Sequence, residues 1–196
     1  EPLVFNDRVA TPPELAAHFT EKIIYLPVSF YVNSHSAVGQ RTPSERAAHA
    51  RRVEEGLPER GVILANFNQP YKLDGLTFSM WMTVLRRVKG SVLWLRTEGT
   101  HAHRQLRHFA NRLGVHPRRI VFAKWAKTSE DHLHRSSLST LSLDTPLYTS
   151  MTTGCDILWA GVPLVTLPES KMVSRLAASL ISALQVPELI ARNRQD

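Results

Sequence analysis

From residue 61 onward, short apolar runs alternate with segments in which apolar residues recur every three or four positions. Runs of the first kind are typical of buried strands, and segments of the second kind are typical of amphipathic helices. The runs predict strands at 62–67, 92–95, 120–122, 138–143 and 163–167. The periodic segments predict helices at about 76–88, 106–113, 130–136, 153–160 and 172–184. This alternation indicates βα units, so we expect an α/β fold with a parallel sheet covered on both faces.

The first 60 residues are less regular. The sequence from Thr11 through Pro12 and Pro13 predicts the capped start of a helix, with prolines near its first turn. Residues 23–32 are mostly apolar and are a candidate strand, whereas residues 33–60 are polar and contain one helical candidate at 44–55. We therefore expect residues 1–60 to contain a connector that leads into a new domain, formed by residues 61–196.

The composition is that of an ordinary soluble globular protein, with 43% hydrophobic and 21% charged residues. No apolar run approaches the roughly 20 residues that span a bilayer, so no membrane association is expected. The single cysteine, Cys155, excludes an internal disulfide and a cysteine-based metal site. It also favours a reducing compartment, either cytoplasm or nucleus.

Both ends of the sequence differ from natural termini. The chain begins at Glu1 without an initiator Met or a signal peptide, and it ends at Asp196 within a helical pattern. We therefore expect a fragment of a longer protein.

The formal net charge of +7 suggests a nucleic-acid binder as an alternative. However, we interpret the basic residues as scattered rather than clustered, and exposed aromatic residues do not alternate with them. Most of them fall where helices should face solvent, so no nucleic-acid partner is expected. The pairs His101/His103 and His132/His134 lack the spacing and the carboxylate of a metal site, and we expect no metal.

Ligands of a parallel α/β sheet bind at the carboxyl ends of its strands, which directs attention to the residues that follow each predicted strand. After the first strand come Asn68, Gln69 and Lys72, where a lysine could neutralise a phosphate. The alternative is a solvated loop lysine, with Asp74 capping the next helix. The position of Lys72 in the sequence fits both interpretations equally.

Two further loops carry candidate binding residues. After the third strand, Lys127, His132 and Arg135 could reach a ribose or phosphates; the alternative is a surface helix in which Asp131 pairs with Arg135. After the fourth strand, Thr152 and Thr153 begin a helix whose free N–H groups and dipole suit a diphosphate; the alternative is a simple helix cap. No Asp-x-Asp pair is present to hold a divalent cation, so cationic side chains and a helix end would have to replace the metal.

Several motifs occur in order along the chain: EKIIYLP (21–27), NFNQPYK (66–72), SVLWL (91–95), LDTPL (143–147), TTGCDILWAGVP (152–163), SRLAAS (174–179) and ELIARNRQ (188–195). Together they resemble the catalytic region of the protein O-GlcNAc transferases. The resemblance implies a GT-B architecture, in which two Rossmann-like lobes face each other across a cleft. Residues 61–196 would be the nucleotide-sugar-binding C-terminal lobe, truncated at its C-terminus, and residues 1–60 the end of the N-terminal lobe and a connector.

The resemblance also implies an activity and the residues that support it. Family members transfer N-acetylglucosamine from UDP-GlcNAc to Ser and Thr hydroxyls of nuclear and cytoplasmic proteins, with inversion and without a metal. Lys72 matches the lysine that stabilises the leaving UDP, and Gln69 matches a residue beside it. The other matched donor-binding positions are Ala126 and Lys127 in the uridine loop, the pair His132 and Arg135, and the helix start with Thr152, Thr153 and Asp156.

One position departs from the family pattern. Met151 stands where the family usually has His before Thr-Thr-Gly, which removes one polar contact to the diphosphate. The alternatives are therefore a GDP-fucose-dependent transferase of the related branch and a degenerate lobe kept as an interaction module. The TPR repeats and most of the first catalytic lobe, which are partners of this region in the family, are absent, so we expect the fragment to bind donor poorly and to catalyse little.

Overall fold

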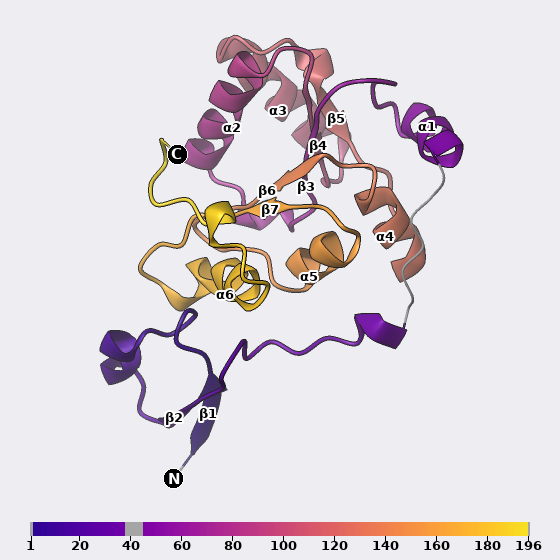
Figure 1. The fold of residues 1–196 in the computed structure, drawn as a ribbon. Helices are drawn as coiled ribbons and strands as arrows, with labels where there is room; N and C mark the ends of the chain where they lie inside the picture. Colours follow the sequence, from indigo (N-terminus) through magenta and orange to yellow (C-terminus); the bar gives the residue numbers. More distant parts are fainter. Residues whose placement is uncertain (1, 38–44, 196) are drawn as a thin grey trace.

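The computed structural model describes residues 2–37 and 45–195 and contains a five-stranded parallel sheet (Figure 1). The strands are β3 (Ile63–Asn66), β4 (Val92–Leu95), β5 (Ile120–Phe122), β6 (Leu141–Leu143) and β7 (Leu164–Val165). Their order in the sheet is β5-β4-β3-β6-β7, and every neighbouring pair is parallel. The predicted parallel α/β fold is confirmed.

The last two strands are shorter than predicted. The N–H groups of Leu138 and Ser139 bond back to the carbonyls of Arg135 and Ser136, so these two residues form a turn directly after the preceding helix, which ends at Ser136. Pairing with the sheet begins only at Thr140, whose N–H donates to the carbonyl of Ile63.

Helices cover both faces of the sheet (Figure 1). They are α2 (Gly75–Arg87), α3 (Thr100–Arg112), α4 (Ser129–Ser136), α5 (Thr152–Trp159) and α6 (Leu176–Ala183), and α1 (Glu45–Glu54) precedes the sheet. Short 3-10 turns lie at η3 (Pro70–Lys72), η4 (Pro117–Arg119), η5 (Met172–Ser174) and η6 (Pro187–Leu189). The single helix predicted at 172–184 is divided at Arg175, whose guanidinium donates to the carbonyls of Val9 and Glu169. The helix predicted at 44–55 is α1, and its first predicted residue, Ser44, lies outside the described residues.

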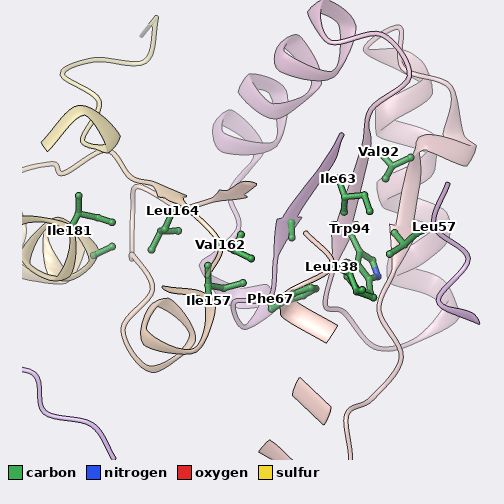
Figure 2. Packing of buried hydrophobic residues seen from close by; sticks show 12 residues of the cluster. Leu57, Ile63, Phe67, Val92, Trp94, Leu138, Ile157, Val162, Leu164 and Ile181 are labelled. Carbon is green, nitrogen blue, oxygen red and sulfur yellow. The ribbon is translucent and has the colours of Figure 1, made fainter. Parts of the chain in front are cut away.

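Alternate residues of the central strands point to opposite faces of the sheet, and each face has its own core. Leu64 and Leu93 face α2 and α3, where Phe78, Trp81, Met82, Leu85 and Ala110 are buried. Ile63 and Trp94 face the other side, and Figure 2 shows Trp94 beside Leu138 in that cluster. Its other buried members include Phe67, Ile157, Leu164, Ala177 and Ile181. No helix in the described part of the chain is both long and apolar enough to cross a membrane.

The N-terminal residues form a separate two-stranded parallel sheet of β1 (Leu3–Asn6) and β2 (Lys22–Tyr25). The helix between them, η1 (Pro13–His18), is a 3-10 helix with Pro12 at its N-cap, and no side chain caps it, so the predicted capped start was wrong in that detail. The strand predicted at 23–32 ends at Tyr25. The division into lobes at about residue 60 stays a prediction.

The buried carboxylate of Asp7 fixes this small sheet to α6. Its Oδ1 accepts hydrogen bonds from the N–H groups of Val9 and Ala10. Its Oδ2 accepts from the N–H of Phe30, at 3.1 Å, and from the hydroxyl of Ser179 in α6, at 2.7 Å. The chain then continues to η2 (His35–Ala37), and residues 29–35 run along α6 and α5 (Figure 1).

Gly154 in α5 has no room for a side chain. A Cβ added there would lie 2.9 Å from Ser150 Oγ, 3.2 Å from Leu180 Cδ1 and 3.4 Å from Leu164 Cδ2. We predict that Gly154→Ala lowers the free energy of unfolding by about 1–3 kcal/mol, because the methyl overpacks the contact of α5 with α6 and β7. Gly75→Ala in α2 is the matched control, since a Cβ there meets no atom within 4 Å. Equal effects of the two substitutions in urea titrations would contradict this packing.

Candidate functional site

The candidate site lies at the point of the sheet where the order of the strands reverses. The chain passes from β3 to β4 and β5 on one side of the sheet, and then crosses to β6 and β7 on the other side of β3. In such sheets the ligand crevice opens at the carboxyl ends of the strands that flank this switch point. Here those strands are β3 and β6, which continue into Asn68 and Asp144.

Asp144 joins the loops at this point. Its Oδ1 accepts hydrogen bonds from Asn68 Nδ2 (3.1 Å), from the N–H of Thr145 (2.9 Å) and from the N–H of Ser150 (2.8 Å). Its Oδ2 accepts from the hydroxyl of Thr166, at 2.8 Å. Burial raises the pKa of Asp144, and these hydrogen bonds oppose that rise. One buried carboxylate thus ties together the segments that follow β3, β6 and β7.

Lys72 lies against the loop that follows Asp144 rather than in solvent. It ends η3 and is half-buried, and its Nζ donates to the carbonyl of Thr149 at 3.0 Å. The ammonium also lies 3.9 Å from the centre of the Tyr148 ring. Burial lowers the pKa of Lys72, and the negative charge of Asp144 opposes this change. The solvated-loop alternative is therefore wrong for Lys72, whereas Asp74 does cap α2, accepting from the N–H groups of Leu76 and Thr77.

The start of α5 has no side-chain cap. Met151 occupies the N-cap position and makes no capping hydrogen bond, so Thr152 and Thr153 lie in the first helical turn. The prediction that one of these threonines is a simple cap was therefore wrong. The hydroxyl of Thr152 instead lies 2.5 Å from that of Tyr31. The first N–H groups of α5 thus have no side-chain acceptor at the N-cap, as an anion site requires.

His132, Arg135 and Asp156 form one chain of contacts. His132 Nε2 lies 3.4 Å from Asp156 Oδ2, and its Nδ1 lies 2.7 Å from the guanidinium of Arg135. His35 adds a contact that the sequence did not suggest, because its Nε2 lies 2.7 Å from Asp156 Oδ1. Burial alone would raise the pKa of Asp156, but the hydrogen bonds from His132 and His35 oppose this change, and the pKa is lowered.

Arg135 is turned inward. Its side chain is buried, donates to the carbonyl of Lys124, and lies 4.8 Å from the centre of the Phe67 ring. The predicted alternative, a surface pair of Asp131 with Arg135, was wrong, because Asp131 lies 3.6 Å from Arg51. Arg135 thus holds the loop after β5 against the core and orients His132.

Three predicted residues lie apart from these contacts. Gln69 is exposed and lines a different pocket, of about 750 Å³, between α2 and α3. Ala126 is half-buried and Lys127 is exposed in the loop that connects β5 to α4. Asp144 and His35 are the site residues that sequence reasoning missed. The position of Asp144 after a strand could have identified it, whereas nothing in the sequence links His35 to Asp156.

The other polar candidates have structural roles. His103 stacks on Phe122, with ring centres 3.8 Å apart. Burial, and then the charge of Asp156, raises the pKa of Cys155 to about 11, so its thiol is neutral near pH 7 and unsuited to nucleophilic attack. Within residues 2–37 and 45–195, no three His, Cys, Asp or Glu side chains form a group that could hold a metal ion.

The positive charge is less scattered than the sequence suggested, because seven Lys and Arg residues and no Asp or Glu lie within residues 99–129. Some of these arginines stabilise the fold. Arg119 donates to the carbonyls of Leu85, Val88 and Ser91. Arg107 donates to the carbonyl of Ile120 and lies over the Phe122 ring. These contacts account for part of the basic cluster without a nucleic-acid partner.

Comparison with known proteins shows the family. Residues 32–196 match the family described as glycosyl transferase family 41, and the chain belongs to it. The chain is 40% identical over 178 residues to the Arabidopsis thaliana protein named "Probable UDP-N-acetylglucosamine–peptide N-acetylglucosaminyltransferase SEC", with 91% of this chain and 18% of that protein covered. It is also 40% identical over 161 residues to the UDP-N-acetylglucosamine–peptide N-acetylglucosaminyltransferase of Caenorhabditis elegans, with 82% of this chain and 14% of that protein covered.

The fold is similar to that of solved structures. A mutant O-GlcNAc transferase from Thermobaculum terrenum superposes with a TM-score of 0.82 at 19% identity, covering all of this chain (100%) and 35% of the other. At this identity the likeness shows the fold, and it confirms the predicted Rossmann-like lobe of a GT-B enzyme. The chain spans less than a fifth of the length of the two relatives above.

The Asp144 contacts give a testable consequence for stability. Asp144→Asn replaces one accepting oxygen by an N–H₂ group, which leaves a buried donor without an acceptor. We expect the free energy of unfolding to fall by about 1–3 kcal/mol. Asp131→Asn, in a partly exposed ion pair with Arg51, is the control and should change it by less than about 0.5 kcal/mol. Urea unfolding followed by circular dichroism measures both; an unchanged midpoint for Asp144→Asn would contradict this role.

Proposed function

We propose that this member of glycosyl transferase family 41 forms the donor-binding part of a protein O-GlcNAc transferase. The reaction is the transfer of N-acetylglucosamine from UDP-GlcNAc to Ser and Thr hydroxyls of proteins, with inversion and without a metal. One observation carries the proposal: Lys72 is held at the carboxyl edge of the sheet, beside the loop that leads into the uncapped start of α5. The names of the two relatives that are 40% identical support the donor and the acceptor class.

The diphosphate of the donor would bind between Lys72 and α5. Tyr148 and Thr149, which contact the Lys72 ammonium, precede Met151 by only a few residues, so the cation lies near the first turn of α5. A lysine presents a compact charge with three donors, and a helix start presents free N–H groups and the positive end of its dipole. Both would stabilise the negative charge that develops on the leaving UDP, in the place of a metal ion.

The nucleoside would bind along the second group of side chains. The Asp156 carboxylate can accept hydrogen bonds from ribose hydroxyls, and His132 and Arg135 keep it and the neighbouring loop in place. The backbone of that loop, at Ala126 and Lys127, would contact the uracil, with Gln69 beside Lys72 on the diphosphate. These roles follow the family resemblance, residue by residue.

In the proposed reaction the acceptor hydroxyl oxygen attacks the anomeric carbon of the sugar. A new carbon–oxygen bond forms as the bond to the UDP oxygen breaks, with inversion at that carbon. The electron pair leaves with UDP, next to Lys72, and the hydroxyl proton passes to a general base. Residues 1–60 would contribute the end of the other lobe. The rest of that lobe, the TPR region and acceptor proteins of the cytoplasm or nucleus would be its partners.

The first test is calorimetric titration of the chain with UDP and with GDP. We predict that UDP binds and that Lys72→Ala weakens this binding on the order of tenfold to a hundredfold, because a charge-assisted contact is lost. Lys89→Ala is the matched control: Lys89 is exposed at the opposite edge of the sheet and should have no effect.

The outcomes of this titration separate the alternatives. A preference for GDP over UDP would favour the fucose-transferring branch. A folded chain that binds neither nucleotide, at concentrations where the longer protein binds UDP, would contradict the proposal for this lobe. Equal loss in the Lys72 and Lys89 variants would contradict a specific role for Lys72.

Met151 offers a second, constructive test. Because Met151 makes no capping contact at the start of α5, an imidazole there would add a hydrogen-bond donor near the diphosphate. We predict that Met151→His strengthens UDP binding several-fold, by about 1 kcal/mol, while Met151→Leu leaves it unchanged. Weaker binding to the His variant would contradict the position assigned to the diphosphate.

A further inference from the structure

Residues 29–35, which we call the strap, cross the helices that carry the proposed donor site (Figure 1). Ser29 Oγ lies 2.8 Å from Ser179 Oγ on α6. Further along, the hydroxyls of Tyr31 and Thr152 are 2.5 Å apart, and His35 Nε2 lies 2.7 Å from Asp156 Oδ1. The strap thus contacts α5 through two residues that the family resemblance assigns to the donor.

The hydrogen-bond partners of His35 determine its protonation form. Nδ1 lies 2.8 Å from Asn33 Oδ1, and that oxygen also accepts from the backbone N–H of His35. Nε2 faces the carboxylate of Asp156. Both ring nitrogens therefore face acceptors, and only the protonated imidazole donates from both. The geometry fits His35 as a cation paired with Asp156.

His132 contacts the same carboxylate as a neutral imidazole. Its Nδ1 faces the guanidinium of Arg135, which can only donate, so Nδ1 is the acceptor of a neutral ring. The proton on Nε2 then points to Asp156 Oδ2, at 3.4 Å. Asp156 thus lies between a charged histidine of the strap and a neutral histidine of α4, with one carboxylate oxygen facing each.

We propose that His35 and Tyr31 are positioning residues of the donor site, and that His35 acts as a protonated imidazole that fixes the carboxylate of Asp156. The inference rests on the proposed function. A ribose hydroxyl gains most from an acceptor that is already oriented, because no side-chain ordering remains to oppose binding. Tyr31 orients the Thr152 hydroxyl at the first turn of α5 in the same way.

This arrangement predicts a pH dependence with a definite sign. When pH rises and His35 loses its proton, one of its ring nitrogens faces an acceptor without a hydrogen, and the contact with Asp156 weakens. UDP affinity should therefore fall as pH rises. The other groups that face this contact in the described residues are Asn33, Cys155, Trp159, His132 and, through His132, Arg135.

The test is UDP titration by calorimetry between about pH 5.5 and pH 8.5. We expect His35→Ala to bind UDP about tenfold more weakly below neutral pH, as for the loss of a charge-assisted contact. The amide N–H₂ of His35→Gln can still donate to Asp156 but does not titrate. This variant should bind UDP nearly as well as the wild type, and its affinity should not show the fall with rising pH that depends on His35. Comparing it with the wild type removes the contribution of the phosphate groups of UDP.

Ser29→Ala is the matched control for the strap. It removes the contact with α6 and the 3.3 Å hydrogen bond from the backbone N–H of Tyr31 to Ser29 Oγ, but it leaves the Tyr31 hydroxyl and the His35 ring in place. It should therefore leave both the affinity and its pH dependence unchanged. Tyr31→Phe should weaken UDP binding about threefold. Circular dichroism of each variant confirms that it is folded.

Two results would overturn the inference in distinguishable ways. If the wild type binds UDP but His35→Ala binds it equally well, or loses affinity only as much as Ser29→Ala does, the strap is structural and the proposed function stands. If the folded wild type does not bind UDP, the proposed function fails, and the role of His35 fails with it.

Discussion

The buried carboxylate of Asp144 is the contact on which the site depends. A carboxylate placed among apolar strands is costly unless several donors surround it, and here four donors do so. Those donors come from the loops after β3, β6 and β7. Their hydrogen bonds to Asp144 therefore hold these three loops together at the switch point of the sheet. Lys72 donates to the carbonyl of Thr149, in the loop that Asp144 holds through Ser150, and the start of α5 follows from the same loop.

Most of the fold could be predicted because apolar runs and helical periodicity are local features of the sequence. β4 and β5 have the predicted bounds, since each is a short apolar run; β4 is buried throughout, and β5 is buried at Ile120 and half-buried at its other two residues. The ends of β6 and β7 could not be predicted, because apolar residues at 138 and 167 are buried without pairing in the sheet. β1 was missed because its apolar run is only three residues long, Leu3 to Phe5, and two of these residues are exposed.

The site was less predictable, because its contacts join residues that are distant in sequence. The family motifs and the rule for strand ends selected Lys72, His132, Arg135, Thr152 and Asp156. The structure joins His132 with Arg135 and Asp156, whereas Lys72 contacts Tyr148 and Thr149, and Thr152 contacts Tyr31. They could not select His35, which reaches Asp156 across 121 positions. They also could not place Gln69, which lines the pocket between α2 and α3 together with Asn68.

The central claim is that the nucleotide binds at the edge formed by η3 and α5. Mapping the backbone amide chemical-shift changes of the chain during a UDP titration tests this most directly. The account predicts the largest changes at Lys72, Thr152, Thr153 and Asp156, with smaller ones in the loop that precedes α4. Changes confined to the pocket between α2 and α3, or to the basic outer face of α3, would contradict it.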